Sequence, residues 1–228
     1  MAIRYYKEIE QGSDEWYAVR CGVLTASEMK HLITGKTLKY ADNPTSRTHL
    51  NELLAQRITG YVEPSYISDD MLRGKEDEIA ARLAYSEHFA PVEEMGFVTN
   101  DKWGFVIGCS PDGLVGKDGG VEFKSRLQKH QVSTIIAGAI PEEHVIQVQT
   151  SMLVTDRPWW DYGSYCAGLP MDVIRAEADP RIQGAIVEAA NAFENTLRER
   201  LALYEETLKS GRRRFIPTTR TIEQEMYI

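Results

Sequence analysis

Apolar residues in the first part of the chain recur at intervals of three and four, which is the spacing of an amphipathic helix. Thr25 and Glu28 have the spacing of a capping box, so we predict that a first helix opens at Thr25. A second helix is predicted to end at Gly60, and a third to run from about residue 73 to residue 89. The apolar positions of these three helices are, in order, Met29, Leu32 and Ile33; Leu50, Leu53, Leu54 and Ile58; and Ile79, Ala80 and Leu83, the last set on one face.

The period changes in the middle of the chain. "GFVIGCS" (104–110) and "GGVEFKS" (119–125) are predicted to be strands joined through a Gly-rich turn. Residues 126–140 are predicted to be helical, and Pro141 to start a further helix whose buried side carries Val145, Val148 and Met152. Strands are then expected at 159–166 and 171–177, followed by a helix from about residue 180 to 209 and a basic tail, "GRRRF". This order predicts an α/β (α+β) fold with a mixed central β-sheet flanked by helices, in a single domain over residues 1–228.

The composition is that of an ordinary globular protein, with 43% hydrophobic and 26% charged residues among 228. No apolar run approaches the roughly 18 residues that span a membrane, and the N-terminus lacks a secretory signal, so we expect a cytoplasmic protein without a membrane partner. Cys21, Cys109 and Cys166 lie far apart, which argues against disulfides and a zinc site. The net charge of −8 argues against nucleic-acid binding, although a local basic groove can exist on an acidic protein.

Charged residues interrupt the strand-forming stretch "SPDGLVGKDGGVEFKSR" (110–126). In a strand, Glu122 and Lys124 project from the same face. Asp112 and Glu122 are symmetric about Lys117, so a turn centred there would place the two carboxylates opposite each other. A turn centred on Asp118-Gly119 would shift the partners by about three residues, and the sequence leaves both registers open.

Two adjacent carboxylates repel each other unless a cation lies between them, and oxygen ligands suit Mg²⁺, with Mn²⁺ as a substitute. A neighbouring ammonium group can orient or deprotonate water, or offset charge that develops on a phosphate. Asp112, Glu122 and Lys124 therefore outline a phosphodiester-hydrolysing site. The alternative is a solvated strand edge with Asp112 in a Pro-Asp-Gly turn.

Four ordered blocks carry a family resemblance: "EWYAVRCGVLTASEM", "RGKEDEIAARL", "GCSPDGLVG…GGVEFKS" and "IQVQTSMLVT". From about residue 10 to 165, the chain resembles the phage lambda-type alkaline exonucleases of the PD-(D/E)xK, or restriction-endonuclease-like, superfamily. The resemblance implies a restriction-endonuclease-like core. It also assigns these site residues: Asp112, Glu122 and the backbone carbonyl of Phe123 as metal ligands, Lys124 as the catalytic lysine, Glu78 as the acid that completes the site (possibly through water), and Gln147 as a polar residue facing it.

The resemblance also implies how the DNA end is held. Arg20 would bind the 5′-terminal phosphate, helped by Thr25 or Ser27 at the predicted helix start, where free N–H groups attract an anion. Met71 and Leu72, placed just before the third helix, would correspond to an apolar wedge that parts the strands. His144, near Gln147, is interpreted as a helix-surface histidine, with a position lining the groove as the alternative.

The implied activity is that of a Mg²⁺-dependent 5′-to-3′ exonuclease on double-stranded DNA with a free 5′ end. It would release 5′-mononucleotides and leave 3′ overhangs for strand-annealing recombination. A homotrimeric ring and an annealing protein are the implied partners. The basic residues expected to line the ring channel are Lys36, Lys39, Arg47, Arg73, Lys75, Arg126 and Lys129. The alternatives are an internal-cutting or structure-specific endonuclease of the same superfamily and a non-catalytic DNA clamp or recombination scaffold.

Overall fold

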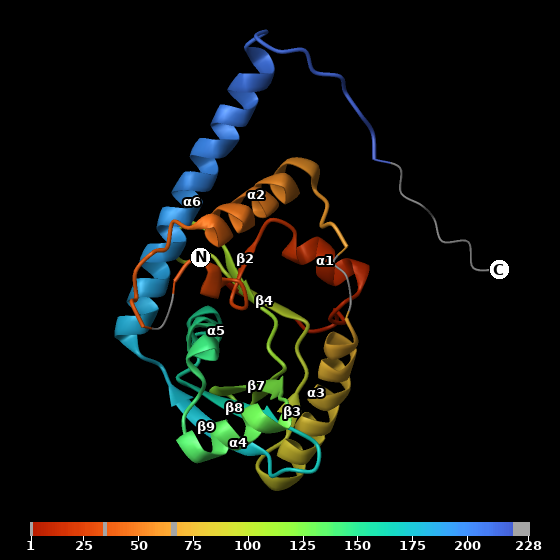
Figure 1. The fold of residues 1–228 in the computed structure, drawn as a ribbon, viewed down its shortest axis with the longest axis vertical. Coiled ribbons are helices and arrows are strands. Elements are labelled where there is room, and N and C mark those ends of the chain that lie inside the picture. The colour runs from red at the N-terminus through yellow and green to blue at the C-terminus, as the bar shows by residue number, and fades with distance from the viewer. Residues whose placement is uncertain (1, 34–35, 65–67, 221–228) are drawn as a thin grey trace, which may run out of the picture.

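The structure is a computed structural model that describes residues 2–33, 36–64 and 68–220 (Figure 1). The predicted α/β class with mixed β-structure flanked by helices is confirmed, and the strands are divided between two mixed sheets. The smaller sheet has the order β1-β4-β5-β2, with the bounds Ile3–Tyr6, Phe97–Asn100, Ile107–Cys109 and Leu24–Thr25. The larger sheet has the order β3-β6-β7-β8-β9, with the bounds Val92–Glu93, Gly113–Val115, Gly119–Ser125, Trp159–Tyr165 and Asp172–Glu177.

Helices cover both sheets. Helices α1 to α6 span Asp14–Arg20, Pro44–Thr59, Asp69–His88, Gln128–Ala137, Glu142–Thr155 and Pro180–Lys209, and a single 3-10 turn, η1, spans Met29–His31. Helix α5 lies between the two sheets in Figure 1, and every residue from Val148 to Thr155 is buried. None of the helices among the described residues has the length and apolar character that crossing a bilayer requires.

Most of the predicted elements are present. Helix α2 ends at Gly60, which adopts the left-handed conformation (φ 65°) that favours glycine at this position. Helices α4, α5 and α6 and strands β8 and β9 lie where the sequence pattern placed them. Helix α3 begins earlier than predicted, after the N-cap Ser68. Val148 and Met152 of α5 are buried as expected, whereas Val145 is only half-buried.

The apolar residues that the spacing places on one face of α3 are not the ones that bury the helix. Ile79 and Leu83 are 53% and 67% exposed, whereas Ala81 and Tyr85 are buried against Val121 of the larger sheet. Tyr85 is anchored there because its hydroxyl donates to Asp161 on β8 at 2.6 Å. This contact with a distant strand, and not the local apolar spacing, sets the rotation of the helix.

The predicted helix opening at Thr25 was also wrong. Leu24–Thr25 forms strand β2, parallel to β5, and the Ala26 N–H continues the pairing to the carbonyl of Gly108. Glu28 does make the expected capping contact, because the Thr25 N–H and hydroxyl both donate to its carboxylate. Only one 3-10 turn follows, since the backbone before it is already committed to the sheet.

The expected hairpin between residues 104–110 and 119–125 does not form. Strand β5 lies in the smaller sheet, and the hairpin partner of β7 is the short strand β6. The pairs Gly113↔Val121, Leu114↔Gly120 and Val115↔Gly119 centre the turn on Lys117, which is the first of the two registers considered. Residues 110–112 therefore carry the chain from one sheet to the other.

Two glycines of β7 leave room for two tryptophans of β8. A Cβ at Gly119 would lie 1.9 Å from the Trp159 ring, and one at Gly120 would lie 2.3 Å from the ring of Trp160, which is fully buried. Arg157, just before β8, donates to the carbonyl of Gly119 at 2.5 Å and holds the same turn. The "GG" of the sequence is thus required by packing between parallel neighbours.

We expect Gly120→Ala to lower the free energy of unfolding by about 1–3 kcal/mol, because the buried Trp160 ring must shift. Gly184→Ala in helix α6 is the matched control: nothing lies within 4 Å of its Cβ, and alanine should stabilise the helix by about 0.5–1 kcal/mol. Urea unfolding of both variants measures the difference. Equal stability of the two variants would contradict this account of the β7–β8 packing.

Candidate active site

The β6–β7 hairpin brings the first two predicted carboxylates together. Continuing the observed register by one residue places Asp112 opposite Glu122. The Phe123 N–H donates to Asp112 Oδ2 at 2.5 Å, so the Asp112 side chain reaches across to β7. The Lys117-centred turn therefore brings Asp112, which directly precedes β6, next to Glu122 on β7.

Glu122 is the most deeply buried acid of this group, with 2% of its surface exposed. Its Oε1 accepts hydrogen bonds from Lys124 Nζ and from Gln147 Nε2 of α5, each at 2.5 Å. Its Oε2 is buried and meets no donor among the described residues. The structure thus gathers Glu122, Lys124 and Gln147 as predicted, and leaves one carboxylate oxygen of Glu122 unsatisfied.

Glu78 joins the group from helix α3. Burial raises the pKa of the Glu78 carboxyl; the Arg82 charge opposes this rise, and repulsion from Glu122 adds to it. Arg82 lies 3.5 Å from Glu78 Oε1 and 3.4 Å from the backbone carbonyl of Asp112. This guanidinium, which we did not single out in the sequence, ties α3 to the Asp112 segment.

The carboxyl groups of Asp112, Glu122 and Glu78 lie close enough to repel one another. Burial raises the pKa of the Asp112 carboxyl well above its usual range, and repulsion from Glu122 and then Glu78 raises it further. Burial by itself would lower the pKa of the Lys124 ammonium, but the charges of Glu122 and Asp112 outweigh it and raise that pKa. Lys124 is therefore held as a cation between two acids.

The residues present fit a divalent cation. The orphaned Glu122 Oε2 and the repulsion around Asp112 both call for a positive charge with oxygen ligands. Within the described residues, no group of three or more His, Cys, Asp or Glu side chains has the geometry to hold a metal ion without rearrangement. One oxygen each of Asp112 and Glu122 is engaged by protein donors, so a bound ion would have to share or displace these hydrogen bonds.

A second cluster lies beside Asp112 in the sequence. Arg20, at the end of α1, donates to Ser110 Oγ at 3.0 Å and stacks 4.1 Å from the centre of the Trp16 ring. Trp16 Nε1 donates to the same Ser110 oxygen at 3.0 Å. Because this oxygen accepts twice, the Ser110 hydroxyl keeps its own proton for another acceptor.

Among the described residues, Arg20 contacts the Ser110 hydroxyl and the rings of Trp16 and Phe97, and it forms no ion pair with a carboxylate. Burial lowers the pKa of its guanidinium, and the Glu28 charge opposes that effect. A fixed, largely buried arginine without an ion-pair partner is suited to bind an anion. Ser110 and Trp16 escaped the sequence analysis because only the fold brings them to Arg20.

The other residues predicted to contact the DNA end differ in how accessible they are to a ligand. Thr25 is 1% exposed and its hydroxyl donates to Glu28 at 2.6 Å, so it is not free for a ligand. Ser27 is half-buried and lies 3.3 Å from the Thr25 hydroxyl. Met71 and Leu72 lie within helix α3 and not before it, and both are about half exposed, at 50% and 51%.

The basic residues predicted to line a channel are mostly exposed, and Arg47 and Arg126 are examples that make contacts within the fold. Arg47 pairs with Asp42 at 2.8 Å, and Arg126 donates to His144 Nε2 at 3.1 Å. His144 is not a surface histidine: it is half-buried and its ring stacks on Tyr162. The exposed members are Lys36, Lys39, Arg47, Arg73, Lys75 and Lys129.

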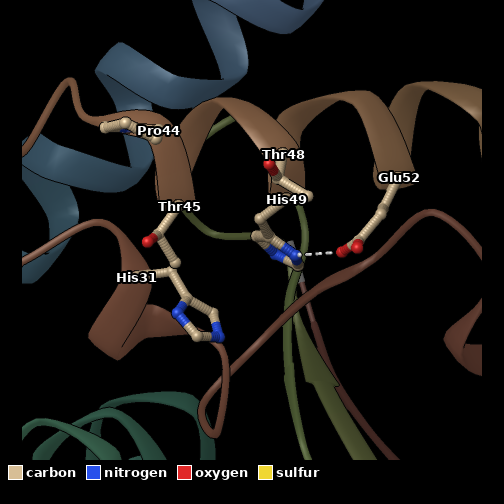
Figure 2. A pocket seen from close by; sticks show the side chains of 6 residues that line it. All are labelled: His31, Pro44, Thr45, Thr48, His49 and Glu52. Atoms are coloured by element: carbon tan, nitrogen blue, oxygen red, sulfur yellow. Dashed lines mark hydrogen bonds and ion pairs between the residues drawn. The ribbon is translucent and has the colours of Figure 1, made fainter.

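A separate open pocket of about 360 Å³ lies elsewhere, and its lining includes none of Asp112, Glu122 and Glu78. Figure 2 shows its lining: His31, Pro44, Thr45, Thr48, His49 and Glu52, from η1 and the first turns of α2. His49 Nδ1 lies 3.4 Å from Glu52, while its buried Nε2 has no hydrogen-bond partner among the described residues. The chemistry described above is therefore concentrated at the hairpin and not in this pocket.

Three solved structures that are similar to this chain are all exonucleases. The alkaline exonuclease LHK-Exo from Laribacter hongkongensis is 30% identical over 87% of this chain and 99% of its own, with a TM-score of 0.77. The structure of LHK-Exo in complex with dAMP matches over the same shares with a TM-score of 0.78. A phage related exonuclease from Haemophilus somnus 129PT, 15% identical over 78% of this chain and 96% of its own, shares the fold with a TM-score of 0.52. No curated protein matches the sequence significantly.

The fold and these neighbours define a nuclease with a restriction-endonuclease-like fold. Residues 15–158 match the YqaJ-like viral recombinase domain, and the chain belongs to that family. The family and the neighbours support a role as a DNA exonuclease that depends on a divalent metal and acts in recombination. The family resemblance drawn from the four sequence blocks is thereby confirmed.

We expect Mg²⁺ or Mn²⁺ to raise the melting temperature of the wild type, because an ion bound only by the folded protein adds about 2.7 kcal/mol at 100 times its dissociation constant. Asp112→Asn should abolish this increase, since it removes a charged ligand while preserving size. Asp118→Asn, in the exposed turn of the same hairpin, is the control and should keep it. A full increase in Asp112→Asn would contradict the site.

Proposed function

We propose that this protein is a Mg²⁺-dependent 5′-to-3′ exonuclease on double-stranded DNA that releases 5′-mononucleotides and leaves 3′ single-stranded overhangs. Mn²⁺ is expected to substitute. The observation that carries the proposal is the convergence of Asp112, Glu122 and Lys124 on one hairpin, with a buried Glu122 oxygen left without a donor. The overhang would serve strand-annealing recombination, with an annealing protein as partner.

In this proposal, Asp112, Glu122 and the backbone carbonyl of Phe123 hold the metal, and Glu78 contributes through water. When bound, the metal polarises the phosphate and lowers the pKa of a water molecule. Lys124 supplies a fixed positive charge to the phosphate as negative charge develops in the transition state. Gln147 holds Glu122 Oε1 in place and orients the carboxylate.

The 5′ direction rests on Arg20. Its guanidinium would bind the 5′-terminal phosphate together with the hydroxyls of Ser110 and Ser27. Ser110 is two residues from Asp112, so the end of the strand would be held close to the hydrolytic site. The similar exonuclease that was solved with dAMP binds a deoxynucleoside monophosphate, which is the class of product proposed here.

We extend the proposal to a homotrimeric ring whose channel carries the exposed basic residues, with Met71 and Leu72 as the strand wedge. The C-terminal half of α6 extends beyond the rest of the fold in Figure 1, and Leu203, Tyr204 and Leu208 on it are exposed. Such apolar side chains offer a surface for contact between copies. A light-scattering mass of one chain would contradict the ring.

Digestion of an end-labelled linear duplex beside a closed circle tests the activity. We expect mononucleotide release from the 5′ strand of the linear DNA in Mg²⁺, none in EDTA, and an intact circle. Lys124→Ala should slow release by at least about 100-fold, because it removes the charge aimed at the transition state. Loss of the circle would identify an internal-cutting endonuclease, and Mg²⁺-independent or absent hydrolysis would reject the proposed function.

We expect a 5′ phosphate to accelerate digestion by the wild type, and Arg20→Ala to remove about 10- to 100-fold of that advantage, the value of one charge-assisted hydrogen bond. The comparison uses matched duplexes with a 5′ phosphate or a 5′ hydroxyl. Arg4→Ala, at an exposed position of β1, is the control and should keep the full preference. An unchanged preference in Arg20→Ala would overturn the assignment of the 5′-phosphate contact.

A further inference from the structure

Beyond the acidic residues, the larger sheet carries a second polar cluster on the same face. The parallel register pairs Glu122 with Tyr162 and Lys124 with Ser164, so the Tyr162 phenol lies beside the carboxylate site. Directly after β7, the Arg126 N–H donates to the carbonyl of Tyr165 at 2.7 Å and keeps this segment against β8. Arg126 and Tyr162 are thereby fixed next to Glu122 and Lys124.

The Arg126 side chain is only 14% exposed. Arginines are rarely buried to this extent without a close carboxylate partner. Arg126 NH1 donates to His144 Nε2 at 3.1 Å and lies 3.5 Å from the largely exposed Glu143. Since a guanidinium can only donate, His144 Nε2 must accept, and the imidazole proton then resides on Nδ1. His144 is therefore a neutral donor held in place by Arg126.

Positive charge surrounds this imidazole. Burial lowers the pKa of His144 to about 4, reinforced by Lys124, Arg126 and Lys30 and opposed by Glu143. Of these cations, Lys124 is paired with the buried Glu122. Arg126 has the largely exposed Glu143 as its ion-pair partner at 3.5 Å, so its charge is only partly balanced beside an acidic centre.

Two donors in the cluster remain unsatisfied. The Arg126 Nε–H and the Tyr162 hydroxyl are shielded from solvent and meet no partner among the described residues. The Tyr162 side chain is fully buried, and of the neighbouring charges the one that acts most strongly on its phenol is Arg126. An unsatisfied buried donor costs about 1–3 kcal/mol, so an acceptor-rich ligand with negative charge would relieve both the donors and the cations.

We propose that Arg126, His144 and Tyr162 form a subsite for a second backbone phosphate of the DNA strand that is cut. The subsite rests on the proposed exonuclease function. Because release of a mononucleotide leaves only the terminal phosphate on the 5′ side of the scissile bond, the neighbouring phosphate bound here lies on the 3′ side. The subsite holds the strand in position after each cleavage.

A chemically neutral linkage tests this directly. The probe is a 5′-phosphorylated duplex in which the second linkage from the 5′ end is a methylphosphonate, which lacks the negative charge of a phosphodiester. In single-turnover digestion with Mg²⁺, the wild type should release the first nucleotide about 10- to 100-fold more slowly from this probe than from ordinary DNA. A methylphosphonate at the eighth linkage is the substrate control and should have no comparable effect.

Arg126→Ala should be slow on ordinary DNA and show no further loss on the neutral probe, because the interacting partner is already absent. Tyr162→Phe retains the ring and its packing. Its rate should fall less on the neutral probe than the wild-type rate does, but more than that of Arg126→Ala. Lys209→Ala, at an exposed position near the end of α6, is the protein control and should keep the full wild-type sensitivity. If Arg126→Ala does not fold, the comparison rests on Tyr162→Phe.

The outcomes are separable from those of the proposed function. A wild type that digests both probes equally fast has the exonuclease activity without this subsite. Full wild-type sensitivity in both Arg126→Ala and Tyr162→Phe would also overturn the subsite, because the charge would then be sensed elsewhere. A wild type that releases no mononucleotide from ordinary DNA fails at the proposed function itself.

Discussion

The register of one short hairpin decides the chemistry of this protein. Asp112 and Glu122 face each other only because the β6–β7 turn is centred on Lys117, and the Phe123 N–H holds Asp112 across the gap. Side chains of a strand alternate between faces, so a shift of one residue would turn Glu122 away from Asp112 and toward the opposite side. Trp160 packing on Gly120 and the hydrogen bonds of Arg157 to the turn secure that register.

Around the hairpin, the fold concentrates charges that repel one another. Gathering Asp112, Glu122 and Glu78 costs free energy, which Lys124 and Arg82 offset in part. Such unfavourable clusters persist where a ligand completes the balance. The same reasoning applies a few residues away. The Arg126 Nε–H and the Tyr162 hydroxyl lack acceptors, which an anion would supply, just as the buried Glu122 Oε2 lacks a donor or cation.

The two sheets give these groups their relative positions. Residues 110–112 pass from β5 of the smaller sheet to β6 of the larger one, and α5 is buried between the sheets. Arg20 is fixed to Ser110 at one end of this crossing, and Asp112 lies at the other. The proposed 5′-phosphate contact and the proposed hydrolytic site are thus separated by two residues along the chain, an arrangement that would suit removal of one nucleotide at a time.

The sequence by itself predicted most element positions, the α/β class and the proximity of Asp112, Glu122 and Lys124, while it left the register of their hairpin open. Helical and strand periodicities are local, and a ten-residue hairpin fixes its own pairing once its centre is known. Only the tertiary structure decided that β5 leaves for another sheet, that Thr25 is in a strand and that Ile79 faces solvent. The contacts of Arg20 with Ser110 and of Arg126 with His144 were equally hidden, because each depends on distant segments meeting in space.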